Sequence, residues 1–145
     1  MIIPNGATKI GSNAFYGYDL LTSITIPDSV TSIGRSAFCD CDSLTSVTIP
    51  DSVTSIGEDA FGYCDSLASV TIGNGVTSIG GATFAYCTSL KEVYCKPTTP
   101  PTGGIHMFYS NASGRKIYVP SNSVSAYKSA SGWSGYSSYI VGYNF

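Results

Sequence analysis

DSVTSIGRSAFCDCDSLTSVTIP, residues 28–50, is the unit from which most of the chain is built. It returns as DSVTSIGEDAFGYCDSLASVTIG at 51–73 and, with more changes, as NGVTSIGGATFAYCTSLKEVYCK at 74–96. An earlier copy, NGATKIGSNAFYGYDLLTSITIP, occupies 5–27. The four copies follow one another without insertion or deletion, so the period is 23 residues. Such a period predicts a solenoid, because one unit cannot bury its own apolar face and stacked units share a core.

Apolar residues recur at fixed positions of the unit, and they predict what each part of it forms. Leu44–Ile49 ends in alternating apolar and hydroxyl side chains, which predicts a half-buried strand whose stacked copies pair as a parallel sheet. Val53–Ile56 predicts a second short extended segment, Gly57 a residue with positive φ, and Glu58–Phe61 one helical or 3₁₀ turn. In the second copy the core columns are Val30, Ile33, Phe38, Leu44, Val47 and Ile49.

The chain departs from the repeat after residue 95 but keeps traces of it. The stretch 96–104 is rich in Pro, Thr and Gly, which predicts a loop. Phe108 resembles the phenylalanine column, and Ile117–Pro120 resembles the end of the repeated strand, one residue out of period. The prediction is one domain, 1–145, with four repeats (1–95) followed by a degenerate fifth coil and a C-terminal cap (96–145).

The last thirty residues predict the cap itself. Ser121 or Ser123 is expected to N-cap a short helix that stops near Gly132. Trp133 and the apolar segment Tyr139–Phe145 are expected to cover the last coil. At the other end nothing comparable is present, so the apolar side chains of the first repeat are expected to lie on an open end, which repeat proteins normally cover.

The charge of the chain is low and unevenly distributed. Charged residues make up 11% of the sequence, hydrophobic residues 43%, and the net charge of −2 gives no reason to expect a nucleic-acid partner. Residues 1–90 hold two bases against eight acids (net −6), whereas residues 91–145 hold five bases against one acid (net +4). We therefore expect an acidic body with a mildly basic C-terminal end.

Two sequence patterns bear on location. No apolar run approaches the eighteen or so residues of a membrane span, so no transmembrane segment is predicted. The first residues already occupy repeat positions and show no charged, apolar and cleavage regions of a signal peptide. We therefore expect this sequence to belong to a longer parent chain.

The repeated residues resemble the BspA-type leucine-rich repeats of bacterial cell-surface proteins, whose 23-residue pattern reads roughly I-P-x-x-V-T-x-I-G-x-x-A-F-x-x-C-x-x-L-x-x-V. Residues 2–95 match it almost throughout, and 117–133 look like the closing segment of many such proteins. The resemblance implies a β-dominated α/β solenoid. Its right-handed leucine-rich-repeat superhelix would carry a parallel β-sheet on the concave face, short helical or 3₁₀ turns and an irregular C-terminal cap.

The same resemblance implies a function class. It is a secreted or surface-anchored bacterial adhesion module that binds other proteins, with extracellular-matrix proteins as ligands of some members. The family shares no catalytic or ligand-binding motif, so no functional residue can be carried over to this chain.

The cysteines allow two interpretations. Cys41, Cys64 and Cys87 share one column, while Cys39 and Cys95 lie elsewhere. Stacked coils bring the Cα atoms of one column within disulfide range, so disulfides between coils or a metal site are conceivable. Stacked side chains point the same way, however, and no C-x-x-C pair is present. Small buried hydrophobic groups are the favoured interpretation.

A column of acids allows a similar choice. Asp19, Asp42 and Asp65 recur at one position, and Thr88 replaces the acid in the fourth copy. Calcium requires several oxygen ligands from more than one side, whereas each coil offers one carboxylate here. A turn role is favoured over a metal site.

No enzymatic chemistry is predicted. His106 is the single histidine, without a nucleophile motif or a second metal ligand, and is expected in a loop. Residues 111–113 (NAS) fit the glycosylation sequon, a match that is common by chance. The chain lacks G-x-S-x-G, P-loop and dinucleotide fingerprints. We expect no catalytic residue, no cofactor and no metal.

The outward side chains of the predicted sheet change character along the chain. The column that begins with Thr25, Thr48 and Thr71 continues with Tyr94 and Tyr118. Tyr and Arg are enriched in binding hot spots. The alternative is that the change merely marks the transition to the cap. The predicted ligand-binding residues are Lys91, Glu92, Tyr94, Arg115, Lys116 and Tyr118.

Three functions remain open at this stage. The first is a protein-interaction or adhesion module with a host or matrix protein as its ligand. The second is a glycan-binding module that uses Tyr94, Tyr118 or Trp133 as stacking platforms. The third is a structural spacer without a ligand of its own. The open N-terminal end also predicts self-association through unpaired coil edges.

Overall fold

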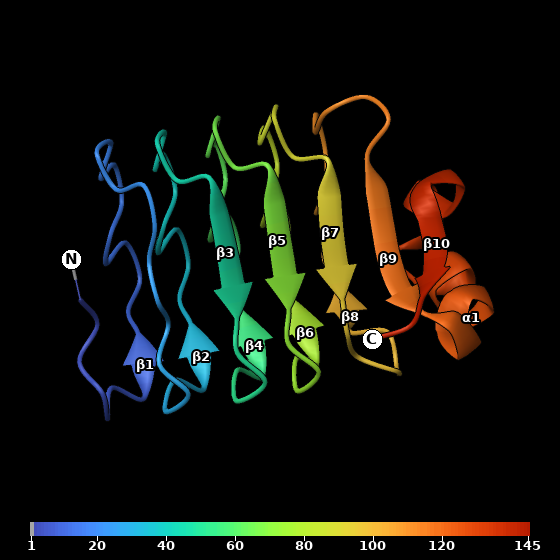
Figure 1. The fold of residues 1–145 in the computed structure, drawn as a ribbon, viewed down its shortest axis with the longest axis horizontal. Helices are drawn as coiled ribbons and strands as arrows, with labels where there is room; N and C mark the ends of the chain where they lie inside the picture. Colours follow the sequence, from blue (N-terminus) through green and yellow to red (C-terminus); the bar gives the residue numbers. More distant parts are fainter. Residues whose placement is uncertain (1) are drawn as a thin grey trace.

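Each repeat forms one turn of a solenoid, which the computed structural model describes over residues 2–145 (Figure 1). The coils stack along the long axis and carry two parallel five-stranded sheets, in the orders β1-β2-β4-β6-β8 and β3-β5-β7-β9-β10. The short sheet contains β1 (Lys9–Ile10), β2 (Ser32–Ile33), β4 (Ser55–Ile56), β6 (Ser78–Ile79) and β8 (Thr102–Gly103). The long sheet contains β3 (Ser46–Ile49), β5 (Ser69–Ile72), β7 (Glu92–Cys95), β9 (Lys116–Pro120) and β10 (Ile140–Tyr143).

The register of the long sheet follows the sequence period. Ser46 pairs with Ser69, and Ser69 pairs with Glu92, so equivalent residues of successive repeats lie side by side. Val47 and Ile49 of β3 are buried while Ser46 and Thr48 are exposed, as the alternation of the sequence predicts. The predicted β-dominated solenoid with parallel sheets is confirmed. None of the helices within residues 2–145 is long and apolar enough to cross a membrane.

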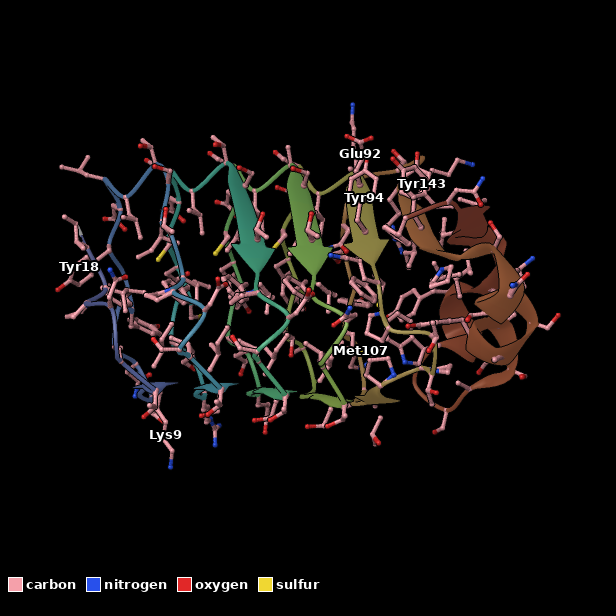
Figure 2. The ribbon with its side chains drawn as sticks, turned by 60° about the horizontal axis from the view of Figure 1, so that its bottom comes forward. Lys9, Tyr18, Glu92, Tyr94, Met107 and Tyr143 are labelled. Atoms are coloured by element: carbon pink, nitrogen blue, oxygen red, sulfur yellow. The ribbon has the colours of Figure 1, made fainter. Side chains whose placement is uncertain are left out.

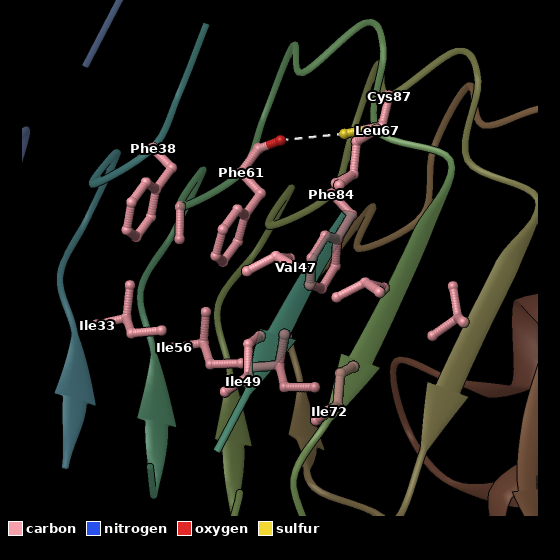
Figure 3. Close-up of a cluster of buried hydrophobic side chains, with 14 of the residues drawn as sticks. Ile33, Phe38, Val47, Ile49, Ile56, Phe61, Leu67, Ile72, Phe84 and Cys87 are labelled. Carbon is pink, nitrogen blue, oxygen red and sulfur yellow. Dashed lines mark hydrogen bonds between the residues drawn. The ribbon is translucent and has the colours of Figure 1, made fainter. Parts of the chain in front are cut away.

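A column of stacked phenylalanines runs through the core (Figure 3). The rings of Phe15, Phe38, Phe61, Phe84 and Phe108 lie nearly parallel, with centroids 5.0 to 5.7 Å apart. The aliphatic columns pack below these rings and are buried as well. Phe108 continues the column although its coil is one residue longer, so the insertion is absorbed outside the core.

The segment that precedes and follows each phenylalanine is a run of turns. The Ala37 amide donates to the Gly34 carbonyl and the Cys39 amide to the Ser36 carbonyl, which is the three-residue spacing of a 3₁₀ turn. Ser36 and Asp40 have φ of 54° and 59°, and equivalent residues in the other repeats are also left-handed. A left-handed residue every fourth position prevents a helix from continuing.

The prediction that Gly57, and the glycines that recur at its position in the other repeats, adopt a positive φ is wrong. The column is instead explained by close stacking of coils: a Cβ on Gly57 would lie 2.6 Å from the Arg35 nitrogen of the preceding coil. Gly34 and Gly80 are blocked in the same way by the backbone of their preceding coils. Gly11 in the first repeat has nothing within 4 Å, because no described coil precedes it.

The cysteine column supplies hydrogen-bond donors to the core. Each thiol lies 3.0 to 3.2 Å from the carbonyl of the phenylalanine one coil back and donates to it. All five cysteines are free and buried, which confirms that they are small buried groups. Figure 3 shows one of these bonds. The three pairs are Cys41 with Phe15, Cys64 with Phe38, and Cys87 with Phe61.

Asn111 takes the place of cysteine in the fifth coil. Its amide nitrogen donates to the Phe84 carbonyl at 2.8 Å and to the Cys87 carbonyl at 3.3 Å. Because both hydrogen bonds use the side-chain nitrogen to which a glycan would be attached, residues 111–113 are unfavourable as a glycosylation site.

The predicted loop over 96–104 contains a strand, so that part of the prediction is wrong. Thr102 donates its amide to the Thr77 carbonyl at 2.9 Å, and Gly104 donates to Ile79 at 2.9 Å. These bonds make β8 the last strand of the short sheet. The prolines before β8 hid this pairing, since proline itself cannot donate to a ladder.

The cap begins with two short helices, η1 (Ser121–Ser123) and α1 (Val124–Ser129). The helix was predicted, and Ser123 stands at the N-cap position of α1 as expected, but its side chain makes no capping hydrogen bond. The Ser123 hydroxyl donates instead to the Thr98 carbonyl at 2.7 Å and fastens the cap to the fifth coil.

The rest of the cap covers the last phenylalanine and then extends the long sheet. Trp133 is fully buried, lies 5.7 Å from Phe108 between ring centroids, and donates its Nε1–H to the Pro101 carbonyl at 2.8 Å. Tyr127, also fully buried, donates its hydroxyl to Pro97 at 2.6 Å. After η2 (Ser134–Tyr139), β10 pairs with β9. The sequence predicted a cover here but missed the strand.

The first repeat is less regular than its sequence predicts. Its segment 23–26 reads like the strands of the other repeats, yet it forms no strand, and β3 is the edge of the long sheet. Ile2 and Leu20 are 88% and 91% exposed at this end of the stack. The two ends of the molecule therefore differ: the last coil is covered, and the first presents apolar side chains.

Candidate functional site

The outward face of the long sheet changes from hydroxyl to aromatic side chains along the stack. Thr48 pairs with Thr71, Thr71 with Tyr94, and Tyr94 with Tyr118, so these residues form one row across four strands. The offset between paired residues is 23 for the first two pairs and 24 for the last, so the extra residue of the fifth coil does not interrupt the row. The two tyrosines thus stand on the same face as the threonines, as the sequence predicted.

Four aromatic side chains gather at the C-terminal end of this row, and we call them the aromatic cluster. Tyr94 and Tyr118 stack with ring centroids 4.8 Å apart and an interplanar angle of 12°. Tyr143 packs edge-on against both, at 5.5 and 5.4 Å, and Phe145 lies 4.8 Å from Tyr143. Figure 2 shows Tyr94 and Tyr143 together on one side of the solenoid. Tyr143 and Phe145 remain 42% and 51% exposed, so the cluster is a surface feature.

Charged residues border the aromatic cluster. The Tyr94 hydroxyl donates to Glu92 Oε2 at 2.9 Å, and this bond is the main reason why the pKa of Tyr94 is raised to about 12. Glu92 pairs in register with Lys116, and Lys91 and Lys116 are both exposed. Five of the six predicted site residues therefore lie on neighbouring positions of β7 and β9 or directly before them.

Arg115, the sixth predicted site residue, serves another purpose. Its guanidinium carbon lies 4.1 Å from the ring centroid of Tyr139 and 5.9 Å from that of Tyr136, both in the cap. Its Nη1 donates to the carbonyls of Asn111 and Ala112 at 3.4 Å. Arg115 thus ties the loop before β9 to the cap, and its charge is not presented beside the aromatic cluster.

The sequence missed Tyr143 and Phe145 as members of the cluster. They belong to no repeat, and β10 joins the sheet by pairing with β9 rather than by continuing the period. Ile140 and Val141 are the signal that could have indicated a strand, since β-branched residues favour strands. A groove of about 450 Å³ runs beside this strand, lined by Lys96, Thr98, Pro120, Ser121, Asn122, Ser123, Tyr143, Asn144 and Phe145.

A second groove, of about 390 Å³, lies at the other end of the long sheet. It follows the unpaired edge of β3, where segment 23–26 runs alongside without pairing. Its lining is mostly hydroxyl and aliphatic, and Lys96 bridges to Asp51 at 3.6 Å at its border. No aromatic side chain lines it. Protein hot spots favour aromatic side chains, which makes the aromatic cluster the better candidate.

The cysteines and the column of acids do not form a reactive or metal-binding site among the described residues. Burial is the main cause that raises the pKa of Cys39 to about 11 and that of Cys95 to about 12, so both thiols are protonated and weakly nucleophilic at neutral pH. Within the described chain, no group of three His, Cys, Asp or Glu side chains is arranged to hold a metal ion. The acids of the column at Asp19, Asp42 and Asp65 are exposed in turns, as predicted.

Trp133 cannot act as a stacking platform for a glycan, because it is fully buried against Phe108. His106 is exposed with φ of 61° and lies 5.0 Å from Tyr109 between ring centroids. It is a turn residue, in agreement with the predicted loop position. Of the three aromatic platforms considered for glycans, Tyr94 and Tyr118 remain.

Comparison with known proteins agrees with this architecture. The family model described as "BspA type Leucine rich repeat region (6 copies)" matches residues 8–131. A search of curated proteins gave no match.

Three solved structures are similar to the chain. A leucine-rich repeat protein from Bacteroides ovatus is 29% identical with a TM-score of 0.67, over 81% of this chain and 32% of that one. The pneumococcal vaccine antigen PcpA is 24% identical with a TM-score of 0.72, over 97% and 35% of the two chains. The T. pallidum leucine-rich repeat protein TpLRR is 23% identical with a TM-score of 0.63, over 82% and 71%. The chain thus spans about a third of the B. ovatus protein, and the last two similarities concern the fold alone.

Proposed function

Because the chain belongs to the BspA-type leucine-rich repeat family, we propose that it is a non-enzymatic protein-interaction module. Its ligand would be a host or matrix protein, bound on the outward face of the long sheet. The observation that carries the proposal is the aromatic cluster, which stands partly exposed at the end of a row of threonines. Exposed aromatic side chains are enriched in protein contact surfaces.

The aromatic cluster favours a protein over a glycan as ligand. A sugar ring packs its C–H groups on an open aromatic face. In this cluster Tyr94 and Tyr118 cover one face of each other, and Tyr143 packs against both. The side of Tyr94 toward Thr71 is where a sugar ring could stack, because no aromatic residue occupies that position of the row. We infer that the crowded cluster as a whole fits the mixed polar and apolar surface of a protein better.

The proposed location is the bacterial cell surface or the extracellular medium, as part of a longer parent chain. The family supports this location. Localisation of the parent protein by surface labelling of intact cells would test this point.

A paired array of purified matrix proteins and of glycans tests the function. We expect the intact chain to bind at least one matrix protein and to show no comparable glycan signal. Replacing Tyr94 and Tyr118 by Ser should weaken that binding by about thirtyfold, as expected for a hot spot worth about 2 kcal/mol. Thermal unfolding should stay cooperative, which separates lost contact from lost fold.

The opposite results are equally clear. Unchanged affinity of the double variant would contradict the proposed surface. A glycan signal that the double variant loses would favour the glycan module. Absence of binding to both arrays would favour a structural spacer.

The open end of the first repeat supports a further, separate proposal of self-association. Ile2, Leu20 and Tyr18 are 88%, 91% and 44% exposed there, and the long-sheet edge at β3 is unpaired. Light scattering over a range of concentrations should show oligomers that Leu20→Glu abolishes. A strict monomer at high concentration would contradict this.

A further inference from the structure

A second row of exposed aromatic side chains lies along the turn segments, away from the long sheet. Tyr63 and Tyr86 stack with ring centroids 4.7 Å apart and an interplanar angle of 10°. Tyr109 meets Tyr86 edge-on at 5.6 Å. The three rings are 47%, 40% and 47% exposed, and we call them the turn-edge row. The proposed protein-binding face makes no use of them.

The backbone conformation of this row is unusual for tyrosine. Tyr63 and Tyr86 have φ of 58° and 61°, a left-handed conformation that is unfavourable for a bulky side chain. The equivalent residues in the first two repeats are Gly17 and Asp40, which are of the types that tolerate it. The third and fourth repeats thus hold an exposed aromatic residue where the backbone favours a small one. Their mutual stacking leaves two-fifths or more of each side chain in contact with solvent.

One face of the Tyr63 ring has no stacked aromatic partner among the described residues, and we call it the open face. Tyr86 stacks on the other face. The residue equivalent to Tyr63 in the second repeat is Asp40, and the exposed Tyr16 lies beside that aspartate.

The pKa of Tyr63 is raised by desolvation first, then by Tyr86 and by the nearby carboxylates of Asp59 and Asp40. The backbone places the same two acids next to Tyr63: the Asp40 amide donates to the Gly62 carbonyl at 2.9 Å, and Asp59 Oδ1 lies 3.7 Å from the position that a Cβ on Gly62 would take. Carboxylates therefore flank Tyr63.

Carboxylates outnumber cations around the row. Asp42 and Asp65 lie close enough for Asp65 to add to the desolvation that raises the pKa of Asp42. Arg35 is a cation of this region: it lies 4.0 Å from Glu58, and its charge also counteracts the desolvation that raises the pKa of Asp59. An open aromatic face bordered by carboxylates attracts a cation both through the ring quadrupole and through Coulomb interaction.

We propose that the turn-edge row is a second interaction surface that binds a basic segment of a protein partner. An Arg or Lys side chain of that segment lies on the open face of Tyr63, and its charge is placed between the carboxylates of Asp40 and Asp59. The apolar part of the segment packs along Tyr86 and Tyr109. The solenoid can thus hold two different protein segments, one on the long sheet and one on the turn edge.

Fluorescence anisotropy with a labelled dodecapeptide of alternating Gly and Arg tests the proposal, with the Gly–Glu peptide of equal length as control. The intact chain should bind the Gly–Arg peptide, more weakly at high salt, and should not bind the control. Tyr63→Asn should reduce affinity by about tenfold through loss of the ring face. Asn tolerates left-handed φ, so this variant should keep its circular dichroism and unfolding midpoint.

Tyr63→Phe keeps the ring and removes only the hydroxyl, so it should bind nearly as well as the intact chain. Asp59→Asn should weaken binding and flatten its salt dependence. The proposal is overturned by wild-type affinity of Tyr63→Asn, by an equal loss in Tyr63→Phe and Tyr63→Asn, or by equal binding of the two peptides. Since Tyr94 and Tyr118 play no part in this test, its failure leaves the function proposed for the long sheet untouched.

Discussion

Repeats two and three and the C-terminal end from residue 91 onward share one interior and differ in their exteriors. The phenylalanine stack runs unbroken from Phe38 to Phe108, and the strands of both regions pair in one sheet. Outside, the regular coils carry Thr48 and Thr71, while the end carries Tyr94 and Tyr118 in the same row. Packing thus constrains the residue type at inward positions in every coil in the same way, whereas the residue type at outward positions can vary. Function is therefore to be sought where the exterior departs from the repeat.

The strongest test of this contrast compares an inward and an outward aromatic residue in one coil. Phe61→Ala removes a fully buried ring between two others and should lower the free energy of unfolding by about 3–5 kcal/mol. Tyr63→Asn, two residues later and 47% exposed, should change it by less than about 1 kcal/mol. Urea unfolding measures both. Equal losses would show that the exterior is also structural.

The glycine column offers a sharper comparison between a coil inside the stack and the first coil. Gly57→Ala would force a Cβ into the backbone of the preceding coil and should cost about 1–3 kcal/mol. Gly11→Ala has open space around it and should be neutral or slightly stabilising. Thermal unfolding of the two variants suffices. A similar loss in both would mean that backbone conformation, not coil stacking, requires glycine.

Variants of Asn111 test whether the irregular end keeps the hydrogen bond to the phenylalanine carbonyl with a different donor residue. Asn111→Ala leaves the Phe84 carbonyl without its donor and should cost about 1–3 kcal/mol. Asn111→Cys introduces the residue that stands at this position in the preceding repeats. There the Cys87 thiol donates to the Phe61 carbonyl, which is equivalent to the Phe84 carbonyl, so this variant should cost less. Chemical denaturation ranks the two variants. If Cys proved worse than Ala, the donor role of this column would be refuted.

The smallest expected effect concerns a single proton on the exterior. The pKa of Tyr94 is about 12, raised from an ordinary value of 10.0 mainly by its hydrogen bond to Glu92, and Glu92→Gln should bring it back toward that value. Since the folded pKa is the higher one, this bond contributes stability below pH 10 that is lost as the pH rises through 12. The contribution is small because solvent screens the pair. Ultraviolet absorbance titration of the phenolate follows it, and an unchanged titration in Glu92→Gln would contradict the assignment.

The regular part of the fold follows from the sequence because its repeats carry the same information four times. Val47 and Ile49 could be assigned to the interior from alternation alone, and the constant period fixed the register of β3, β5 and β7. The meaning of Gly57 could not be deduced, because the same residue type serves positive φ and close approach, and only the neighbouring coil distinguishes them.

The irregular end was predictable only in part. Lys91, Glu92, Tyr94, Lys116 and Tyr118 were placed together by extrapolating the period. The Arg115 side chain lies against Tyr139 instead of beside the other five residues, and no period encodes this contact with the cap. Tyr143 was missed for the same reason, since β10 pairs by tertiary structure alone. Residues whose partners lie outside the repeat require the structure.

A single variant tests the central claim most directly: Glu92→Ser, Tyr94→Thr, Lys116→Ser and Tyr118→Thr together give the end of the long sheet the exterior of the regular coils. Its unfolding free energy and its affinity for the matrix protein selected by the intact chain are measured side by side. We predict a free energy of unfolding within about 1 kcal/mol of the intact chain, with binding lost. Full binding by this variant, or its failure to fold, would contradict the separation of a repetitive interior that makes the fold from an irregular exterior that makes the contact.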